Sequence, residues 1–280
     1  MVKRRKRATK AILLKKNVTG RQLARVSAIK YRETLWSELY PGNQHTVHCF
    51  QPAVLAIESS LELDERQRKR TVWRMDGGAG TDEHIKWLLA RGYHVIAKGL
   101  SHFRAAKLAQ QAQRWDAYDD WWLAEVPPSV DYGCPIRVFV RRRLKDDKWR
   151  HSYYLSTLQL PSKGCFLDFY HRRGGAEVEQ FRQDKSGLNL ATRRKQSFTG
   201  QLGYILLTDL AHNLLADFHH KALVGSRFEN YGLKRIVRDL LNVPGRLVVE
   251  NNQLKSVELL TLMKNSKDLI ICLERYISAQ

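Results

Sequence analysis

Residues 71–99 read TVWRMDGGAGTDEHIKWLLARGYHVIAKG and decide the fold class. The run that ends at Asp76 is short and β-prone, and the glycines after it indicate a tight turn. Thr81 is a good helix N-cap, Asp82 lies in a first turn where the helix dipole favours anions, and Gly92 ends the helix. The residues after Gly92 predict a second strand. A strand–helix–strand unit implies parallel strands, so we predict an α/β fold with a mixed sheet.

The rest of the chain has patterns typical of further strands and helices. Alternating residues within 20–40 predict two strands, and RVFVRRR and SYYLSTLQL, on either side of KDDK at 145–148, predict a β-hairpin. The apolar spacing predicts helices over 52–70, 101–114, 176–190, 197–220 and 233–242, and a last helix near the C-terminus. His212 falls within one of these helices, and we interpret it as a core histidine.

The charge balance favours a polyanionic partner. The 280 residues include 48 Lys or Arg against 28 Asp or Glu, a formal net charge of +20, and 43% of them are apolar, which allows a sizeable core. Basic side chains that neutralise phosphates release condensed counterions, which drives binding to nucleic acid. Residues 1–16 carry eight Lys or Arg and no acid, so they form either a phosphate-contacting arm or a solvated tail. A generally basic surface, as in ribosomal-type proteins, is the alternative.

The cysteines and the apolar runs argue against several classes of protein. The four cysteines are far apart, with no Cys-x-x-Cys pair, so we expect neither a disulfide framework nor a zinc ribbon. No apolar run approaches the length of a membrane span, and no apolar segment of the signal-peptide type follows the basic N-terminus. We therefore predict a cytoplasmic protein with reduced thiols and no membrane partner.

Asp76 is the first candidate for chemistry. It ends a predicted strand, and in open α/β sheets ligands gather at the carboxyl ends of the strands. A carboxylate there can hold Mg²⁺, which prefers oxygen ligands, or it can merely cap the turn. The glycines at 77, 78 and 80 could instead cradle a phosphate, but the segment lacks both a dinucleotide fingerprint and a Gly-Lys-Ser/Thr motif. Nucleotide binding is therefore the weaker hypothesis.

Residues 170–185, YHRRGGAEVEQFRQDK, contain a second candidate group. Tyr170, Arg173 and Glu177 are three and then four residues apart, which would place them on one face of a continuous helix. A metal-bound carboxylate among cations suits phosphodiester chemistry, because metals bind the attacking and leaving oxygens while cations hold the flanking phosphates. A salt-bridged, solvated helix face is the alternative.

Two long segments resemble one known family. Residues 70–99 and 170–215 (YHRRGGAEVEQFRQDKSGLNLATRRKQSFTGQLGYILLTDLAHNLL) are similar to insertion-sequence transposases of the DDE class, in the group with a Tyr-Arg-Glu-Lys signature. The resemblance covers nearly the whole chain from about residue 8. It implies a ribonuclease H-like core with a β-rich insertion and a helical C-terminal part. It also implies two Mg²⁺ or Mn²⁺ ions, strand cleavage by water and strand transfer by a DNA 3′-hydroxyl.

The resemblance gives individual residues a role. Asp76 matches the second catalytic aspartate and Glu177 the catalytic glutamate, and both would bind metal. Tyr170 and Arg173 match the first two positions of the signature and would contact DNA. The implied partners are transposon-end and target DNA, bound by a homodimer in the bacterial cytoplasm, in association with the nucleoid.

The chain departs from the family pattern in two places. The signature lysine would fall at Asp184, and Lys185 comes one residue late, which makes Glu179 a minor rival for the catalytic glutamate. The first catalytic aspartate has no match, because the only aspartate before Asp76 is Asp64, in a predicted helix. We therefore expect an N-terminally truncated core that is inactive as this chain.

Further DNA contacts are expected in the β-rich insertion and beyond the signature. Related transposases carry a tryptophan in the insertion that stacks on an extruded base, and Trp149 is our candidate, beside Trp115, Trp121 and Trp122. A core position is the alternative for each tryptophan. Arg193 and Arg194 are candidate phosphate contacts. The predicted segments are a basic tail (1–16), the two parts of the core (17–98 and 159–220), the insertion (99–158) and a C-terminal extension (221–280).

Three functions remain open on the sequence. The first is a DNA transposase catalytic domain, inactive as this chain. The second is a non-catalytic, DNA-binding relic or inhibitor of an intact transposase, which the missing aspartate favours. The third is a nucleotide-binding enzyme that uses the turn at Gly77–Gly80.

Overall fold

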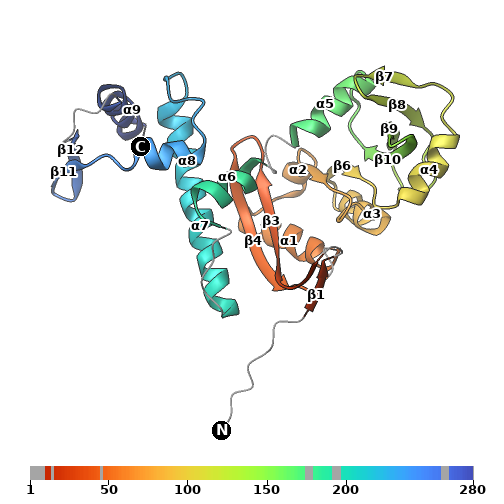
Figure 1. Cartoon of the computed structure of the whole chain (residues 1–280), viewed down its shortest axis with the longest axis horizontal. Helices are drawn as coiled ribbons and strands as arrows, with labels where there is room; N and C mark the ends of the chain where they lie inside the picture. Colours follow the sequence, from red (N-terminus) through yellow and green to blue (C-terminus); the bar gives the residue numbers. More distant parts are fainter. Residues whose placement is uncertain are drawn as a thin grey trace, which may run out of the picture. The chain divides into compact units, whose positions relative to one another are not determined.

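The computed structural model describes residues 10–13, 16–44, 47–173, 179–190, 197–259 and 265–279 (Figure 1). The chain divides into two compact units. Unit 1 comprises Met1–Ala24 and Tyr40–Arg173, and unit 2 comprises Arg25–Leu39 and Gly174–Gln280. Glu177, Arg193 and Arg194 lie outside the described residues, as does the side chain of Arg173.

Unit 1 is built on a six-stranded mixed sheet. Its strands are β5 (Val72–Met75), β6 (His94–Lys98), β7 (Asp116–Tyr118), β8 (Trp121–Val126), β9 (Arg137–Lys145) and β10 (Lys148–Ser156). They lie in the order β5-β6-β10-β9-β8-β7, with β5 parallel to β6 and every other neighbouring pair antiparallel. The prediction of an α/β fold with a mixed sheet is confirmed.

Helices cover both faces of this sheet, because apolar side chains point alternately to either face of its strands. On one face, α1 (Val47–Ser60), α3 (Asp82–Ala90) and α4 (His102–Gln110) share a core with strand residues such as Val95 and Val140. On the other face, α5 (Lys163–Arg173) packs Phe166 on Phe139 of β9, with ring centroids 4.2 Å apart.

The strand–helix–strand unit forms as its residues predict. The side chain of Thr81 accepts a hydrogen bond from the backbone N–H of His84, and Gly92 has a φ of +87° at the end of α3. A Cβ at Gly80 would collide with the backbone oxygen of Lys98, so this turn requires glycine where it approaches the end of β6. These local signals fix the parallel pair β5–β6.

The helix predicted over 52–70 is instead two helices. The first, α1, begins at Val47, and the second, α2 (Glu65–Arg68), begins after Asp64. Asp64 accepts a hydrogen bond from the N–H of Gln67, and the Gln67 side chain accepts one from the N–H of Asp64. This capping box starts a new helix, which is why the pattern does not run on as one.

The hairpin β9–β10 turns as predicted at Asp146 and Asp147, with φ of +52° and +53°. Such a pair of left-handed residues is typical of a two-residue β-turn. Because β10 pairs with β6, the strands of segment 99–158 belong to the same sheet as β5 and β6. The division of the chain into functional segments stays a prediction.

Unit 2 contains most of a β-hairpin and the C-terminal helices. The hairpin is β3 (Arg21–Ala28) with β4 (Glu33–Pro41), and the first helices are α6 (Glu179–Gly187) and α7 (Phe198–Phe218). A wide helical turn η2 (His219–Leu223), α8 (Leu233–Arg235), a second wide turn η3 (Ile236–Leu240) and α9 (Ser266–Ser278) pack with the end of α7 in one apolar cluster. Two further hairpins are β1 (Lys10–Leu13) with β2 (Lys16–Thr19), in unit 1, and β11 (Gly245–Glu250) with β12 (Gln253–Leu259).

None of the helices in the described ranges is both long and apolar enough to cross a lipid bilayer.

Candidate functional site

Asp76 follows β5 directly and is exposed. Its Oδ1 accepts a hydrogen bond from the N–H of Gly78 at 3.0 Å, and its backbone oxygen accepts from Gly80 at 2.9 Å. The side chain therefore stabilises the glycine turn. Its second carboxylate oxygen has no ion pair within the described ranges, so it remains suited to a hard cation such as Mg²⁺.

A metal site needs more donors than Asp76 supplies. Within the described part of the chain, no group of three or more His, Cys, Asp or Glu side chains could hold a metal ion. Glu177, the other predicted ligand, lies outside that part. The donor set predicted for Mg²⁺ therefore cannot be completed from the residues that the structure describes, and the metal stays a prediction.

The glycine turn does not resemble a phosphate cradle. The first turn of α3 carries Asp82, whose carboxylate accepts hydrogen bonds from Arg104 Nη1 at 2.7 and 2.8 Å and from the Tyr132 hydroxyl at 2.6 Å. Burial opposes ionisation of Asp82, but these bonds outweigh it and lower the pKa of the carboxyl group. The N-terminus of α3 thus already faces a carboxylate, which disfavours a phosphate there.

The described signature residues differ in their surroundings. Tyr170 is buried, 6% exposed, on α5, where its ring packs on Tyr154 with centroids 4.7 Å apart. Arg173 is the last residue of α5, and Glu179 is the first of α6. Lys185 is exposed on α6. Tyr170 is thus part of a packed aromatic cluster, while Lys185 is free to meet solvent or a ligand.

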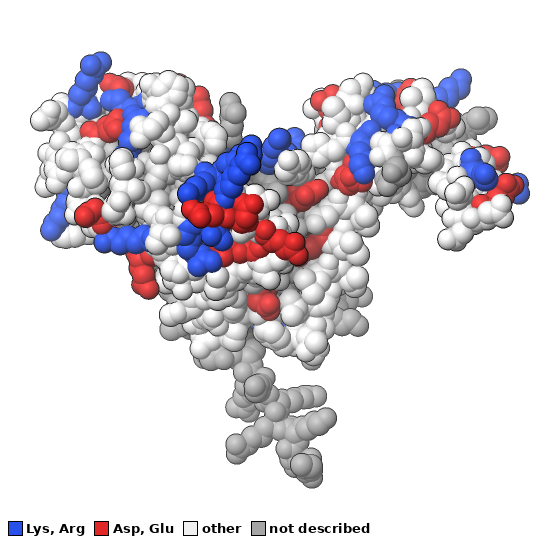
Figure 2. All heavy atoms as spheres, turned by 180° about the vertical axis from the view of Figure 1, so that it is seen from behind, with Lys and Arg blue, Asp and Glu red and all other residues white. Residues whose placement is uncertain are grey.

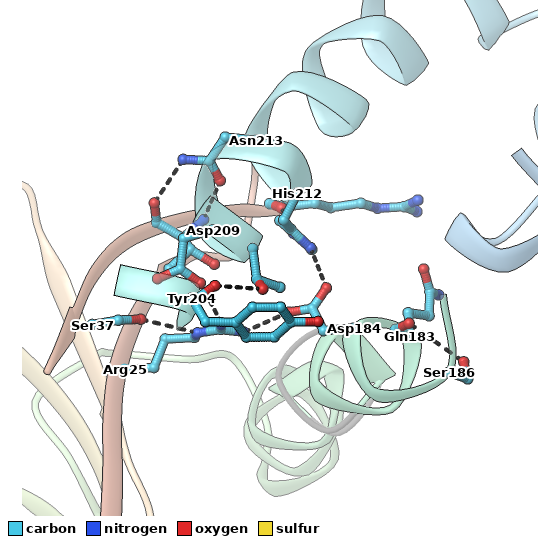
Figure 3. Close-up of polar contacts among 12 residues, drawn as sticks. Arg25, Ser37, Gln183, Asp184, Ser186, Tyr204, Asp209, His212 and Asn213 are labelled. Carbon is cyan, nitrogen blue, oxygen red and sulfur yellow. Dashed lines mark hydrogen bonds and ion pairs between the residues drawn. The ribbon is translucent and has the colours of Figure 1, made fainter. Parts of the chain in front are cut away.

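Asp184, at the position of the signature lysine, is fully buried in unit 2 (Figure 3). Its Oδ2 accepts from Arg25 Nη1 at 2.5 Å and its Oδ1 from His212 Nδ1 at 2.7 Å. Arg25 also pairs with Asp209 and donates from Nε to Ser37 Oγ at 3.1 Å. This Arg25 network joins β3, β4, α6 and α7 through four ionisable groups of balanced charge.

His212 is charged in this network. Its Nε2 lies 2.7 Å from the backbone oxygen of Arg32, so both ring nitrogens face acceptors and both must carry a proton. Burial opposes the charge, but the hydrogen bond and charge attraction of Asp184, together with the bond to the Arg32 carbonyl, outweigh it and raise the pKa of His212. Burial also raises the pKa of Asp209, against the attraction of Arg25. The prediction that His212 is a satisfied core histidine is confirmed.

The next helical residue, Asn213, fixes β4 on α7. Its Oδ1 accepts from the N–H of Thr34, and its Nδ2 donates to the carbonyl of Thr34, both at 2.8 Å (Figure 3). The side-chain amide therefore bonds to Thr34 as a neighbouring strand would.

Arginine and tryptophan side chains share the sheet of unit 1. On one face, the guanidinium of Arg142 lies 4.2 Å from the ring centroid of Trp115 and 4.6 Å from that of Trp149. Trp122 stands opposite Arg142 in the strand register and meets Trp149 edge-on at 5.3 Å. We call these four residues the Arg142 stack. It reaches solvent at Trp149, which is 43% exposed.

The preceding residue, Arg141, points to the other face of the same sheet. Its guanidinium lies 3.5 Å from the ring centroid of Trp121, and Arg143 lies 4.7 Å from the same ring. The Arg141 side chain also contacts Tyr154 and His171. We call Arg141, Arg143, Trp121, Tyr154 and His171 the Arg141 cluster.

Basic side chains elsewhere are mixed with acidic ones. On the face shown in Figure 2, Lys and Arg lie beside Asp and Glu where charged side chains gather. Arg137, for example, is bonded to Glu125 at 2.8 Å, and Arg104 to Asp82. Arg142 differs, because it has no ion pair with any carboxylate in the described ranges and its Nε has no hydrogen-bond partner. The net charge of the chain therefore does not indicate which arginines, such as Arg142, lack a carboxylate partner.

Comparison with known proteins does not identify a family for this chain. No protein-family model matches the chain, and no curated protein matches it. The resemblance to DDE transposases therefore stays a prediction that rests on the two sequence segments.

The sequence hypotheses did not include the Arg25 network. Arg25 is 159 residues from Asp184 and 184 from Asp209, and no local pattern links them. One available signal was Asp209 among the apolar residues of the helix predicted over 197–220, since a buried carboxylate requires a partner.

Proposed function

We propose that this chain is a DNA-binding protein of the DDE transposase type and that it does not cut DNA by itself. The Arg142 stack carries this proposal. It combines a guanidinium without an ion pair in the described ranges with tryptophan rings, one of which is 43% exposed. Exposed aromatic rings stack on bases, and guanidinium groups bind phosphates, so the stack supports binding of nucleic acid.

We propose that the chain does not cut DNA because it has too few carboxylates in the positions that the reaction needs. Asp64, the only aspartate before Asp76 in the sequence, is engaged as the cap of α2. Two-metal chemistry needs carboxylates gathered around both ions. With Asp64 held in a helix cap, Asp76 and Glu177 are the remaining candidates, and they are one carboxylate short of the family's set.

Metal-dependent DNA cleavage and strand transfer is the second candidate function. The position of Asp76 favours it, since this exposed carboxylate follows a strand of a parallel pair. A ribonuclease H-like core is part of the same proposal, supported by the mixed sheet in which β5 and β6 are parallel. On this hypothesis Asp76 and Glu177 hold the metal, and Tyr170, Arg173, Lys185, Arg193 and Arg194 contact DNA.

DNA affinity tests the proposal. Trp149→Ala and Arg142→Gln should each weaken binding to a transposon-end or generic oligonucleotide by about 5- to 100-fold, because each removes a stacking or phosphate contact. Arg137→Gln is the matched control, because Arg137 is already bonded to Glu125. The control should keep wild-type affinity. Binding should also fall steeply with added salt, since it releases counterions.

Nicking of a supercoiled plasmid in Mg²⁺ separates the two candidate functions. We expect salt-sensitive binding without nicking. Nicking by the wild-type chain that is lost in both Asp76→Ala and Glu177→Ala would instead establish the catalytic function. Wild-type DNA affinity in both Trp149→Ala and Arg142→Gln would rule out the Arg142 stack as the interface.

A further inference from the structure

Arg141 is a buried guanidinium group without a countercharge in the described part of the chain. The residue is 9% exposed, and its Nε has no hydrogen-bond partner. Within the described residues, the one polar contact of its side chain is Nη1 to His171 Nε2 at 3.3 Å, in which the imidazole accepts. Burial lowers the pKa of the Arg141 guanidinium. A buried charge is costly unless an opposite charge or a full set of hydrogen bonds compensates it.

The surroundings of Arg141 add positive charge. Arg143 shares the ring of Trp121 with it, and Arg150 stands opposite Arg143 in the register of β9 and β10. None of these three arginines forms an ion pair with a carboxylate in the described ranges. The remaining neighbours, Trp121 and Tyr154, supply ring faces, which attract a cation but do not neutralise it.

Several basic groups around Arg141 reach the surface. His171 and Arg150 are exposed, and Arg143 is half-buried. An anion can therefore approach the inner guanidinium past these groups. Guanidinium groups present forked donors that match the oxygens of phosphate, and a partly enclosed site strengthens such bonds.

We propose that the Arg141 cluster is a binding site for a single phosphate group. Arg141 donates to it from the guanidinium group, Arg143 supplies a second guanidinium, and His171 lines the same exposed side. The phosphate group comes either from a DNA strand, in which case the site deepens the DNA-binding function proposed above, or from free inorganic phosphate.

Inorganic phosphate is the direct probe, and it requires no DNA. The melting temperature of the whole chain is measured in sodium phosphate and in sodium chloride of equal ionic strength. Saturating phosphate should raise the melting temperature of the wild type by about 2–4 °C more than chloride does, because it binds the folded state alone. In Arg141→Gln this difference should vanish. In Arg137→Gln, whose arginine is bonded to Glu125, it should persist.

Two further measurements keep the test informative if Arg141→Gln does not fold. Arg143→Gln, which alters a more exposed arginine, should reduce the phosphate response severalfold. In the ¹H–¹⁵N spectrum of arginine Nε–H groups, the resonance that disappears in Arg141→Lys should shift when phosphate is added to the wild type. A wild-type chain that gains nothing from phosphate over chloride, with that resonance unmoved, overturns the proposal.

DNA distinguishes the two sources of the phosphate group. A DNA affinity about 10-fold weaker in Arg141→Gln than in the wild type assigns the site to a phosphodiester of the bound strand. Unchanged DNA affinity, with the phosphate response lost, assigns it to free phosphate. The DNA-binding proposal fails on a different result, wild-type affinity in Trp149→Ala and Arg142→Gln, so the two failures are distinguishable.

Discussion

Arg25 in unit 2 and Arg141 in unit 1 are both buried arginines, but their positive charges are compensated in different ways. The Arg25 side chain is 1% exposed and pairs with two carboxylates, Asp184 and Asp209. Arg141 is 9% exposed and has ring faces and an imidazole around it, with no carboxylate in the described ranges. Arg25 also lies 5.0 Å from the ring of Phe181, so aromatic contact does not distinguish the two. The two arginines differ in their countercharge. Carboxylates neutralise Arg25 within a structural network, whereas Arg141 lacks a carboxylate in the described ranges and is the proposed anion site.

The largest expected effect is that of Arg25→Met. This change leaves Asp209 without its cation and Asp184 with His212 alone, and breaking a buried pair in this way costs roughly 3–5 kcal/mol of unfolding free energy. Urea denaturation measures the cost. Glu65→Gln, which removes the exposed pair between Glu65 and Lys69, is the control and should leave the midpoint unchanged. If Arg25→Met unfolds at the same urea concentration as this control, the network does not stabilise unit 2.

The next effect is a pH dependence that belongs to the Arg25 network. The folded-state pKa of His212 is raised, so the stability it contributes is fully present below its unfolded pKa and is lost as pH rises through the folded value. Asp209 acts in the same direction in a more acidic range, because burial raises its pKa as well. The charged groups that face His212 are Asp184, Arg25 and Asp209.

Unfolding free energies measured between about pH 6 and 9 isolate the histidine, since it titrates in that range. The wild type should lose stability across this interval relative to His212→Gln, whose lower stability should vary less with pH. Parallel pH profiles for the two proteins would show that His212 is not charged in the folded state.

The smallest expected effect is that of Arg141→Met, and it gives the sharpest contrast with Arg25. Replacing an uncompensated buried charge by an apolar chain of similar length should change the unfolding free energy by about 1 kcal/mol or less, towards higher stability, in chloride buffer. The same urea titration compares the two substitutions directly. A loss in Arg141→Met as large as that in Arg25→Met would mean that the sheet itself supplies the compensation, and the anion site would be unnecessary.

Local sequence signals predicted the parts of the fold that depend on local contacts. Thr81, Gly92 and the Asp146–Asp147 turn define a helix start, a helix end and a hairpin, each through neighbours a few residues away. The break between α1 and α2 was equally local, in the reciprocal capping of Asp64 and Gln67, although the periodicity suggested one helix.

The candidate sites depend on register and on distant contacts. Consecutive residues of a strand point to opposite faces of the sheet, so the side chains of Arg141 and Arg142 must lie on different faces. Which tryptophans meet them follows from the pairing of β8 with β9 and from the segments packed on each face, and single-sequence patterns do not contain that information. The carboxylate partners of Arg25 are more than 150 residues away and were beyond any spacing argument.

The amide of Asn213 has a consequence for association between chains. A strand at the margin of a small sheet exposes backbone N–H and carbonyl groups that can recruit a strand from another molecule. At Thr34 both groups are already bonded to Asn213, a residue held in the long helix α7. The contact that fixes the hairpin on this helix therefore also blocks one point of intermolecular β-pairing, and its loss would expose the hairpin to aggregation as well as loosening it.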